Sequence, residues 1–439
     1  MPSATHTTPT TRVISPARSL RGSLTLPGDK SISHRYAMLA GFAKGTSRLT
    51  NFSTGADPHS SLACMSALGA TTKRDGRTIE VTGTAGSFHQ PKTDLDCGNS
   101  GSTMRMLSGL VAAQQGTFRF TGDESLSKRP MERIRKPLEQ MGARVSLTDG
   151  HAPMTIHGAE LKAIDFEAPI ASAQVKTAVL FAGLQAKGTT SFAESIRTRD
   201  HTEHALKAFG AELVRRPHQG QDRVYIAGGQ HLEGIDATVP GDISSAAFFL
   251  CAALLFEDSN LVLDALGLNP TRASLLDAIT TLGGHIKVLD VKEQHGEMIG
   301  TIQVNRNRTL KGITILGALS AQLIDELPVI AAIAPYTEEG VGIRDARELR
   351  VKESDRIALV VKNLRAMGAE VTEHEDGLDV PGNQQLHGAE IDSGSDHRIA
   401  MAFSIAALRA VGDTAIHGAE AASISFPEFF DWLDELAIR

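Results

Sequence analysis

One pattern of apolar and polar positions recurs along the chain: an amphipathic helical stretch that ends in Gly-Ala or a close match, then two short β-rich segments. The copies begin at Ala67 (ALGATTKRDGRTIEVTG), Gln140 (QMGARVSLTDGHAPMTIHG), Ala208 (AFGAELVRRPHQGQDRVYIAGG), Thr281 (TLGGHIKVLD) and Ala366 (AMGAEVTEHEDGLDVPG). Each carries a glycine suited to the left-handed residue that closes a helix before a strand, namely Gly69, Gly142, Gly210, Gly283 and Gly368. One such glycine would mean little in any α/β protein. Five followed by similar strands indicate a repeated helix-and-strand module.

The spacing of these glycines gives the size of the module. Successive intervals are 73, 68, 73 and 85 residues, which is longer than the roughly 20–50 residues of a solenoid repeat. A chain of 439 residues is also too long for one ordinary core. We therefore predict about six modules, grouped into domains of about 200 residues.

A second repeated segment marks where the chain is expected to pass from one domain to the other. Leu26–Asp29 reads Leu-Pro-Gly-Asp and Val239–Asp242 reads Val-Pro-Gly-Asp, and each precedes a helical run. Pro-Gly ends a strand, and the Asp can cap the helix that follows. We interpret both segments as crossings between two domains, so that one domain is discontinuous.

Composition narrows the class of protein. Apolar residues make up 41% and charged residues 22%, the balance of a soluble globular protein, and no apolar run approaches the ~20 residues that span a bilayer. The net charge of −7 argues against nucleic acid as the main partner, but it allows an anionic small substrate where basic residues gather. Cys64, Cys97 and Cys251 lie far apart without CxxC spacing. We therefore expect no disulfide framework or thiolate metal site, and a reducing cytoplasm.

Several predicted helices open with small polar residues and place a cation about one turn on. The segments are Gly28–Arg35, Gly98–Arg105, Ser172–Lys176, Arg350–Arg356 and Asp396–Arg398. A helix N-terminus attracts phosphate or carboxylate, and a nearby Arg or Lys adds a full charge. Any one of these segments is more often a plain solvated helix start. Together they favour a substrate with several anionic groups, bound by several helix starts.

The usual cofactor and nucleophile motifs are missing from the sequence. It contains no GxxxxGK[ST], no strand-linked GxGxxG, no HExxH and no GxSxG. ATP, NAD, a zinc-type site and a nucleophile elbow are therefore not supported. We expect an activity that needs no cofactor and no metal.

At this point the residues resemble a known family. The segments LPGDKSISHR, CGNSGSTMR, SLSKRPM, SAQVK, RVKESDR and DHRIAM match, in order, signature segments of 5-enolpyruvylshikimate-3-phosphate synthases, from about Arg21 to Phe430. The resemblance implies an α/β (α+β) fold, a two-domain inside-out α/β barrel in which each domain has three helix-and-strand repeats and the active site lies in the interdomain cleft. It places residues 1–27 and 241–439 in the discontinuous domain and residues 28–240 in the other.

The resemblance also implies the reaction, transfer of the enolpyruvyl group of phosphoenolpyruvate to the 5-hydroxyl of shikimate 3-phosphate in the shikimate pathway of aromatic amino-acid biosynthesis. The residues implied for shikimate 3-phosphate are Lys30, Ser31, Arg35, Ser172, Ala173, Gln174, Arg199, Asp325 and Lys352. Those implied for phosphoenolpyruvate are Lys30, Gly101, Arg129, Gln174, Arg356 and Arg398, with Arg105 as a structural neighbour. The catalytic residues implied are Asp325 as base, Glu353 for the proton at the vinyl carbon, and Lys30. A cytoplasmic monomer is expected. Without the resemblance, a helix cap and a surface ion pair are the plainer interpretations of Asp325 and Glu353.

The sequence departs from the family pattern at two places. Four short segments resemble the glyphosate-tolerant branch called class II: Gly28–Ser31, Ser172–Lys176, Arg199–Glu203 and Asn269–Arg272. An Ala methyl helps tolerance in that branch, whereas this chain has Gly101, which leaves more room for glyphosate. Some relatives have a Lys before the final Ser/Thr-Phe-Pro, but here Ile424 precedes Ser425. The sequence thus predicts class II and leaves tolerance open.

Two other functions compete with this interpretation. UDP-N-acetylglucosamine enolpyruvyl transferase shares the fold and the donor, but it uses a Cys or Asp on a mobile loop and an early Lys-Asn pair. This chain has Lys30-Ser31 instead, and no Cys between Gly122 and Met131. A non-catalytic anion-binding protein of the same fold would be favoured by loss of Asp325, Glu353 or Lys30, and all three are present.

Overall fold

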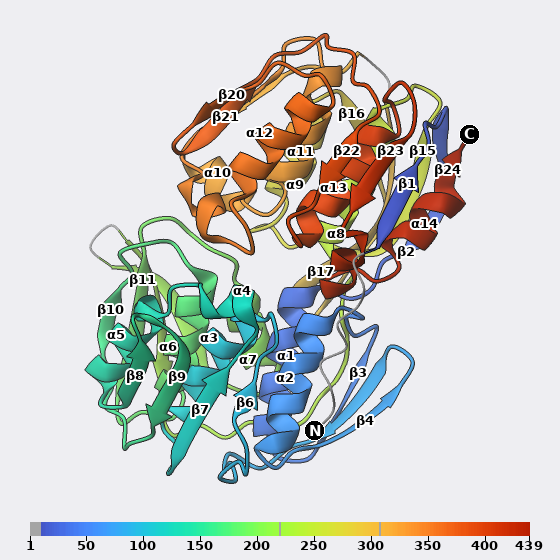
Figure 1. The fold of residues 1–439 in the computed structure, drawn as a ribbon. Helices are drawn as coiled ribbons and strands as arrows, with labels where there is room; N and C mark the ends of the chain where they lie inside the picture. The colour runs from blue at the N-terminus through green and yellow to red at the C-terminus, as the bar shows by residue number, and fades with distance from the viewer. Residues whose placement is uncertain (1–9, 219–220, 307–308) are drawn as a thin grey trace. The chain divides into compact units, whose positions relative to one another are not determined.

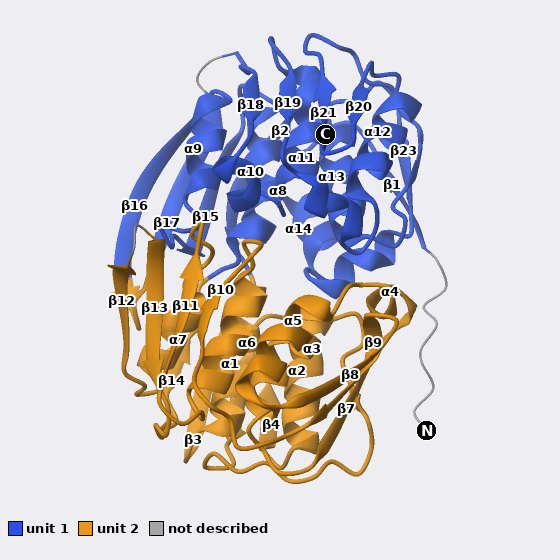
Figure 2. Cartoon of the chain, turned by 90° about the vertical axis from the view of Figure 1, so that its left-hand side faces the viewer, with its two compact units in different colours: residues 1–26, 241–292, 299–439 blue, residues 27–240, 293–298 orange. Residues whose placement is uncertain are grey.

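Two units, each built of three α/β repeats, make up the computed structural model, which describes residues 10–218, 221–306 and 309–439 (Figures 1 and 2). Unit 1 comprises Met1–Leu26, Gly241–Lys292 and Ile299–Arg439, and unit 2 comprises Pro27–Pro240 and Glu293–Met298. The boundaries expected from the sequence differ from this division at residue 27 and at 293–298, the tip of a hairpin, which groups with unit 2.

The three repeats of unit 2 share one sheet order, although in the first repeat the edge strand β14 comes last in the chain rather than first. The first consists of β14 (Asp236–Thr238), α1 (Lys30–Phe42), β3 (Thr46–Thr50), α2 (Ala56–Ala67), β4 (Thr71–Asp75) and β5 (Thr78–Thr82). The second consists of β6 (Leu95–Asp96), α3 (Gly101–Val111), β7 (Thr117–Thr121), α4 (Glu124–Ser127), α5 (Glu132–Met141), β8 (Arg144–Thr148) and β9 (His151–His157). The third consists of β10 (Asp165–Glu167), α6 (Ala173–Gly183), β11 (Thr189–Glu194), α7 (His201–Ala208), β12 (Leu213–His218) and β13 (Gln221–Ala227). The sheet orders β14-β3-β5-β4, β6-β7-β9-β8 and β10-β11-β13-β12 are therefore equivalent.

Unit 1 follows the same plan with additions. The first repeat has β2 (Ser19–Thr25), α8 (Ile243–Leu254), β15 (Asn260–Gly267), α9 (Ser274–Thr281), β16 (Gly284–Gln294) and β17 (Glu297–Arg306), with β24 (Ala437–Ile438) added beside β2. The second has β18 (Ile313–Ile315), α10 (Ala318–Gln322), α11 (Leu327–Ile333), η1 (Ala334–Tyr336), β19 (Val341–Ile343), η2 (Arg347–Val351), α12 (Arg356–Ala366), β20 (Thr372–His374) and β21 (Gly377–Val380). The third has β22 (Glu390–Asp392), α13 (His397–Ala407), β23 (Thr414–His417), η3 (Ala419–Ile424), α14 (Phe429–Leu436) and β1 (Thr11–Ile14). In the third sheet β1 pairs antiparallel with β23, the place that a hairpin strand takes in the other repeats.

The two Pro-Gly-Asp segments lie where the chain leaves one unit for the other. β2 is parallel to β15 of unit 1, but the chain continues from β2 into α1 of unit 2. It returns from β14, which is parallel to β3, into α8 of unit 1. Asp29 caps α1 by accepting from the Ile32 amide at 2.9 Å, and Asp242 caps α8 by accepting from the Ser244 amide at 2.7 Å. The prediction that each Asp caps the next helix is confirmed.

The glycines of the recurring phrase have the predicted backbone conformation. All five have positive φ, at 110°, 114°, 95°, 105° and 89° in chain order. Each follows a helix and precedes a strand, as in α5, where Gly142 is the left-handed cap before β8. The left-handed helix end is therefore the common element of the repeats.

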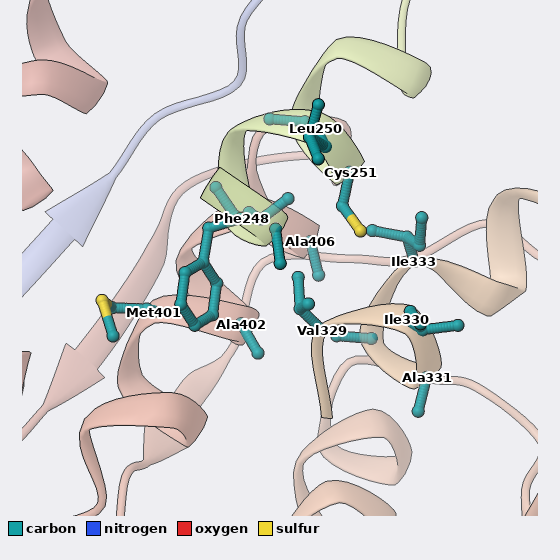
Figure 3. Packing of buried hydrophobic residues seen from close by; sticks show 14 of the residues in the cluster. Phe248, Leu250, Cys251, Val329, Ile330, Ala331, Ile333, Met401, Ala402 and Ala406 are labelled. Carbon is teal, nitrogen blue, oxygen red and sulfur yellow. The ribbon is translucent and has the colours of Figure 1, made fainter. Parts of the chain in front are cut away.

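The inner helices are buried almost all round. All twelve residues of α8 and all eleven of α13 are buried. In unit 1 Phe248 and Cys251 of α8 share a core with Val329 of α11 and Met401 of α13 (Figure 3). A helix surrounded in this way offers mainly its ends to a ligand. Among the described residues, no helix has both the length and the apolar character that a bilayer crossing requires.

The two crossings provide a matched test of close packing. An added Cβ at Gly28 would lie 1.9 Å from the Asn51 carbonyl oxygen and 2.8 Å from Val239, whereas one at Gly241 would come no closer than 3.2 Å, to the Ala265 carbonyl oxygen. Gly28→Ala should therefore lower the free energy of unfolding by about 3 kcal/mol, and Gly241→Ala should change it by less than about 1 kcal/mol. Denaturant titration of both variants measures the difference. Equal stability of the two would contradict this packing.

Candidate active site

The start of α1 gathers three of the predicted residues in unit 2. The Lys30 ammonium donates to Asp57 Oδ2 at 3.0 Å, and both side chains are largely buried. Arg199 Nη1 donates to the Ser31 hydroxyl at 3.3 Å. Lys30 and Ser31 are the first two residues of α1 after the Asp29 cap, so both lie at its N-terminus. Lys30, Ser31 and Arg199 thus form one polar cluster.

Arg35 lies deeper than a typical surface ligand. It is 2% exposed, and it donates to the Thr202 hydroxyl at 2.7 Å, the Thr177 hydroxyl at 2.9 Å and the Ser31 carbonyl at 2.8 Å. Burial, helped by the nearby Arg199, lowers the pKa of Arg35 to about 10. Arg35 therefore ties α1 to α6 and α7, and its contact with a substrate stays a prediction.

The start of α3 holds a second cluster in unit 2. Ser100 caps this helix by accepting from the Thr103 amide at 3.1 Å. An added Cβ at Gly101 would meet Arg105 Nη1 at 3.2 Å and Arg129 Nη1 at 3.5 Å, so both guanidinium groups face this helix start. These two arginines are only 8% and 7% exposed. Two cations and the N-terminus of a helix converge here, an arrangement suited to an anion.

Gln174 joins this cluster to α6. Its amide oxygen accepts from Arg105 Nη1 at 2.8 Å, and its amide nitrogen donates to the Ser102 hydroxyl at 2.9 Å. Ser172 caps α6 by accepting from the Val175 amide at 3.4 Å. Ser172, Ala173 and Gln174 therefore lie at one helix start, as the sequence predicts, and Arg105 contacts Gln174 and lies close to Gly101.

Lys176 departs from the expected pattern. Its side chain is 0% exposed, and the ammonium lies 3.0 Å from both Glu194 Oε2 and Glu203 Oε1. The idea that this cation faces an anionic ligand, like those of the other helix starts, is wrong. Spacing alone could not show the two carboxylates, because they come from β11 and α7.

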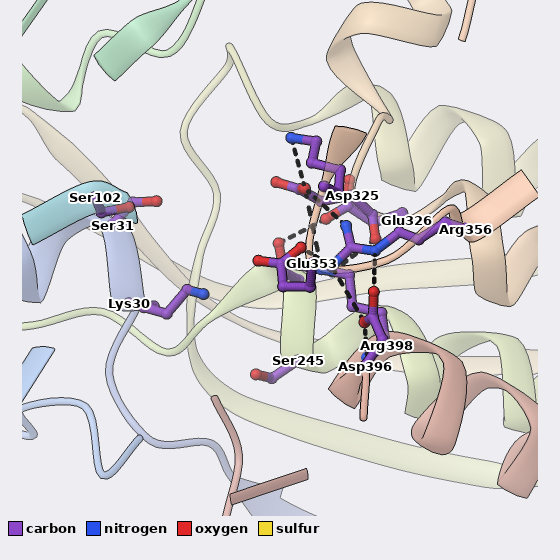
Figure 4. Close-up of polar contacts among 12 residues, drawn as sticks. Lys30, Ser31, Ser102, Ser245, Asp325, Glu326, Glu353, Arg356, Asp396 and Arg398 are labelled. Carbon is purple, nitrogen blue, oxygen red and sulfur yellow. Dashed lines mark hydrogen bonds and ion pairs between the residues drawn. The ribbon is translucent and has the colours of Figure 1, made fainter. Parts of the chain in front are cut away.

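Unit 1 contains the acid/base candidates. Asp325 Oδ1 lies 3.6 Å from Lys352 Nζ, 3.7 Å from Arg356 Nη1 and 4.0 Å from Arg398 Nε. Arg398 Nη1 also donates to the Asp325 carbonyl at 2.6 Å. Figure 4 shows this group within unit 1 together with Glu353, whose carboxylate accepts from Arg356 Nη2 at 2.5 Å. Three cations thus surround the Asp325 carboxylate, two from the segment 350–356 and one from the start of α13.

The plainer interpretations of the two acids do not fit this geometry. Glu326, not Asp325, precedes α11, and no side chain caps that helix. The Asp325 side chain is 15% exposed, and the Glu353 side chain is 16% exposed beside the wholly buried Arg356. The Glu353 pair is therefore not a fully exposed ion pair, and both acids lie in a partly desolvated, cation-rich region.

Asp396, which the sequence offered only as the first residue of a helix-opening segment, is buried against this group. Its carboxylate accepts from Arg356 Nε at 2.8 Å and the Ser354 hydroxyl at 2.9 Å, and it caps α13 by accepting from the Arg398 amide at 2.9 Å. Burial alone would raise the pKa of Asp396, but Arg356 holds it below its ordinary value. The available signal was its place directly before the α13 helix, where Asp is a preferred cap.

The pKa values of two cations in this cluster are shifted in opposite directions by burial and by the neighbouring carboxylates. Burial lowers the pKa of Lys352, although Asp325 opposes the change. Burial would also lower the pKa of Arg356, but Asp396 and Glu353 outweigh it and raise the pKa. Arg356 is therefore a fixed charge, whereas Lys352 is the titratable cation beside Asp325.

No role was predicted from the sequence for a further buried polar cluster in unit 1, which consists of Arg272, Glu326 and Ser244. Arg272 Nη2 lies 2.8 Å from Glu326 Oε1 and also contacts the Ser244 hydroxyl. Arg272 ends the segment Asn269–Arg272, in which the Asn269 side chain accepts from the Thr271 amide at 2.8 Å. The class II pattern in the sequence therefore corresponds to a turn that directs an arginine to the start of α11. Across residues 10–218, 221–306 and 309–439, no three His, Cys, Asp or Glu side chains are placed to hold a metal ion.

Three comparisons with known proteins agree. A sequence model of the family described as EPSP synthase (3-phosphoshikimate 1-carboxyvinyltransferase) matches residues 14–433. The chain is 60% identical over 427 residues to the 3-phosphoshikimate 1-carboxyvinyltransferase of Koribacter versatilis (strain Ellin345), which covers 97% of this chain and 99% of that protein. It is 53% identical over 426 residues to the protein of the same name from Solibacter usitatus (strain Ellin6076), with 97% and 99% covered.

A solved structure is similar across both units. An EPSP synthase structure from Acinetobacter baumannii has a TM-score of 0.86 and 39% identity, covering 98% of this chain and 99% of that chain. Together with the equivalent sheets of the repeats, this likeness confirms the predicted two-domain α/β fold.

The buried Asp396–Arg356 pair generates a stability prediction. Asp396→Asn removes the partner of a buried cation and should lower the free energy of unfolding by about 3 kcal/mol at pH 7. Because the folded-state pKa of Asp396 lies below the ordinary ~3.9, its contribution is present above about pH 4 and is lost as the pH falls through the folded-state value. Urea titrations between pH 7 and pH 3 should therefore show a smaller acid loss in the variant. The same acid loss in both proteins would contradict the assignment.

Proposed function

This chain belongs to the EPSP synthase (3-phosphoshikimate 1-carboxyvinyltransferase) family, and from that membership we propose that it transfers the enolpyruvyl group of phosphoenolpyruvate to the 5-hydroxyl of shikimate 3-phosphate. The observation that carries the proposal is the Asp325 carboxylate, which lies within 4.0 Å of three cations, Lys352 and Arg356 from one segment and Arg398 from another. One base amid surplus positive charge suits a reaction whose two substrates are both anionic.

The shikimate 3-phosphate ligands proposed in unit 2 lie at the starts of α1 and α6 and on the loop after β11. They are Lys30, Ser31, Arg35, Ser172, Ala173, Gln174 and Arg199. In support, both sets of residues lie at helix N-termini, which attract anions, and Arg199 contacts Ser31 at 3.3 Å. In unit 1, Asp325 and Lys352 would hold the ring hydroxyls, with the lowered pKa of Lys352 giving a readily shared proton.

Phosphoenolpyruvate would be held by arginines in both units. The proposed ligands are Lys30, Gly101, Arg129, Gln174, Arg356 and Arg398. The two guanidinium groups that face Gly101 support this assignment, since they would bind a phosphate or carboxylate in two-pronged fashion. Each arginine already donates to protein acceptors, so its side chain loses little conformational freedom when substrate binds.

The chemistry proposed is an addition followed by an elimination. Asp325 takes the proton of the 5-hydroxyl as its oxygen bonds to C2 of the enol, while Glu353 delivers a proton to C3. The tetrahedral intermediate then loses phosphate from C2, and the C3 proton returns to the enzyme as the double bond reforms. Lys30 and the arginines stabilise the negative charge on the phosphate and carboxylate throughout. The proposed steps use no metal and no cofactor.

We also propose the setting of this reaction. The protein would act as a monomer in the cytoplasm on small molecules, with neither nucleic acid nor membrane as a partner. The net charge of −7 supports the absence of a nucleic-acid role.

The activity itself is the first test. Purified protein should release phosphate only when phosphoenolpyruvate and shikimate 3-phosphate are both present, with no metal added. Asp325→Asn should slow release by about 10²–10⁴-fold because the base is lost. The same change at the exposed Asp434 should leave the rate within about twofold, since surface substitutions away from a site are usually mild. If wild-type protein releases no phosphate, UDP-N-acetylglucosamine should be tried as acceptor and the proposal abandoned.

Gly101 gives a prediction for the donor. In Gly101→Ala the new methyl would press on Arg105 and Arg129, so the KM for phosphoenolpyruvate should rise by roughly three- to tenfold. The KM for shikimate 3-phosphate should rise less than the KM for phosphoenolpyruvate, because Gly101 is proposed for the donor alone and reaches the acceptor ligands indirectly, through neighbours such as Arg105, which contacts Gln174. Steady-state kinetics with each substrate varied, and with glyphosate as inhibitor, measure this. Unchanged donor kinetics would remove Gly101 from the proposed site.

A further inference from the structure

The buried Lys176 has a task other than binding a ligand. Its ammonium is enclosed by Glu194 and Glu203, each 3.0 Å away, and its side chain has no exposed surface. Arg215 adds a second cation to the cluster, with Nη2 2.5 Å from Glu203 Oε1 and 3.7 Å from Glu194 Oε2, and its other end contacts Asp222. A buried charge set of this kind is costly to desolvate, so it is weak evidence for stabilisation by itself.

The Glu194 carboxylate divides its two oxygens between two segments. One oxygen, Oε2, faces Lys176, and the other, Oε1, accepts both from the Thr198 amide at 3.1 Å and from the Thr198 hydroxyl. Glu194 is the last residue of β11, and the loop that follows connects β11 to α7 at His201. The carboxylate therefore closes this loop on the strand that precedes it, and Lys176 fixes the orientation of the carboxylate.

The residue directly after Thr198 is Arg199, the cation proposed for the phosphate of shikimate 3-phosphate. Arg199 Nη1 reaches the Ser31 hydroxyl at 3.3 Å, so its side chain points to the start of α1. A loop without internal anchors would leave an arginine free to sample many rotamers, and ordering it would weaken binding. With Thr198 held at two atoms, the backbone before Arg199 is already fixed.

We infer that Glu194, oriented by Lys176, is a positioning residue that holds Thr198 and thereby directs Arg199 toward the phosphate of the acceptor substrate. This inference rests on the proposed function, because Arg199 is a ligand only if that function is right. It also gives Lys176 a role different from the one that its spacing predicted. Lys176 does not face the ligand itself but acts on the phosphate site through the Glu194 carboxylate and the loop that follows β11.

Thr198→Val tests the link without placing an unpaired charge in the core. The variant keeps the backbone amide bond but removes the hydroxyl bond to a carboxylate, so shikimate 3-phosphate should bind roughly five- to tenfold more weakly by calorimetry. Thr198→Ser, which keeps the hydroxyl, should bind like wild type. The KM for shikimate 3-phosphate should rise accordingly, while kcat and the KM for phosphoenolpyruvate stay within about twofold, a split that a general loss of stability would not produce.

A double-mutant cycle separates positioning from a direct contact. If Thr198 acts through Arg199, Thr198→Val should have no further effect on affinity in an Arg199→Ala background. Glu194→Gln should show the same selective loss of affinity for shikimate 3-phosphate. If that variant does not fold, the Thr198–Arg199 double-mutant cycle, whose two residues lie on a partly exposed loop, is sufficient to test the inference.

The outcomes are distinct. Selective, non-additive loss in Thr198→Val supports the inference. Wild-type affinity in Thr198→Val, with a clear loss in Arg199→Ala, overturns the inference and leaves the proposed function intact. Additive losses overturn it as well, since Thr198 would then act independently. If wild-type protein does not bind shikimate 3-phosphate at all, the proposed function fails and the inference fails with it.

Discussion

The enclosure of the inner helices constrains where this chain can place its chemistry. Every residue of α8 and of α13 is buried, so side chains along most of their length must be apolar or fully paired. Within such helices, polar contacts with a ligand are therefore expected mainly at the helix starts. Lys30, Gly101, Ser172, Arg356 and Arg398 all lie in the first turn of a helix or at its cap. The repeat fold therefore supplies the same kind of anion-binding end several times over.

The cations at these ends share a second property, which is that protein acceptors already hold them. Lys30 has Asp57, Arg129 has Asn99, and Arg356 has Asp396. Charges fixed in a partly desolvated region act more strongly on a substrate than mobile surface charges, because little reorganisation accompanies binding. The cost of holding them falls on buried carboxylates such as Asp396, whose lowered pKa reports the attraction.

The sequence predicted features that depend on neighbouring residues. Five glycines after helices, and two Asp caps after Pro-Gly, each follow from local backbone chemistry, and all are found. The resemblance to the family implied Asp325 and Lys352 for one substrate and Arg356 and Arg398 for the other, and in unit 1 the three cations lie within 4.0 Å of Asp325. Their partners were harder to foresee. Asp57 has no periodic or motif signal, and a pattern of spacing cannot show that Lys176 turns inward, since its two carboxylates lie on other elements.

Hairpin 284–306 accounts for the difference between the expected division and the observed one at 293–298. Its tip, 293–298, groups with unit 2, where Glu297 contacts the buried His201 ring at 2.7 Å. The apolar and polar pattern of two paired strands does not indicate which unit the turn between them will contact. Tertiary contacts decide it.

The position of β2 in the chain has a consequence for synthesis. Leu20 of β2 bonds to Ser259, 239 residues later, and Thr11 of β1 bonds to His417, 406 residues later. Because a chain emerges N-terminus first and domains fold as units, the contiguous stretch Pro27–Pro240 is complete before the sheet partners of β1 and β2 have been made. Both strands are thus made before Pro27–Pro240 and paired only after it. Their backbone edges stay without these partners while Pro27–Pro240 is synthesised, so they are open to wrong strand pairing during that interval.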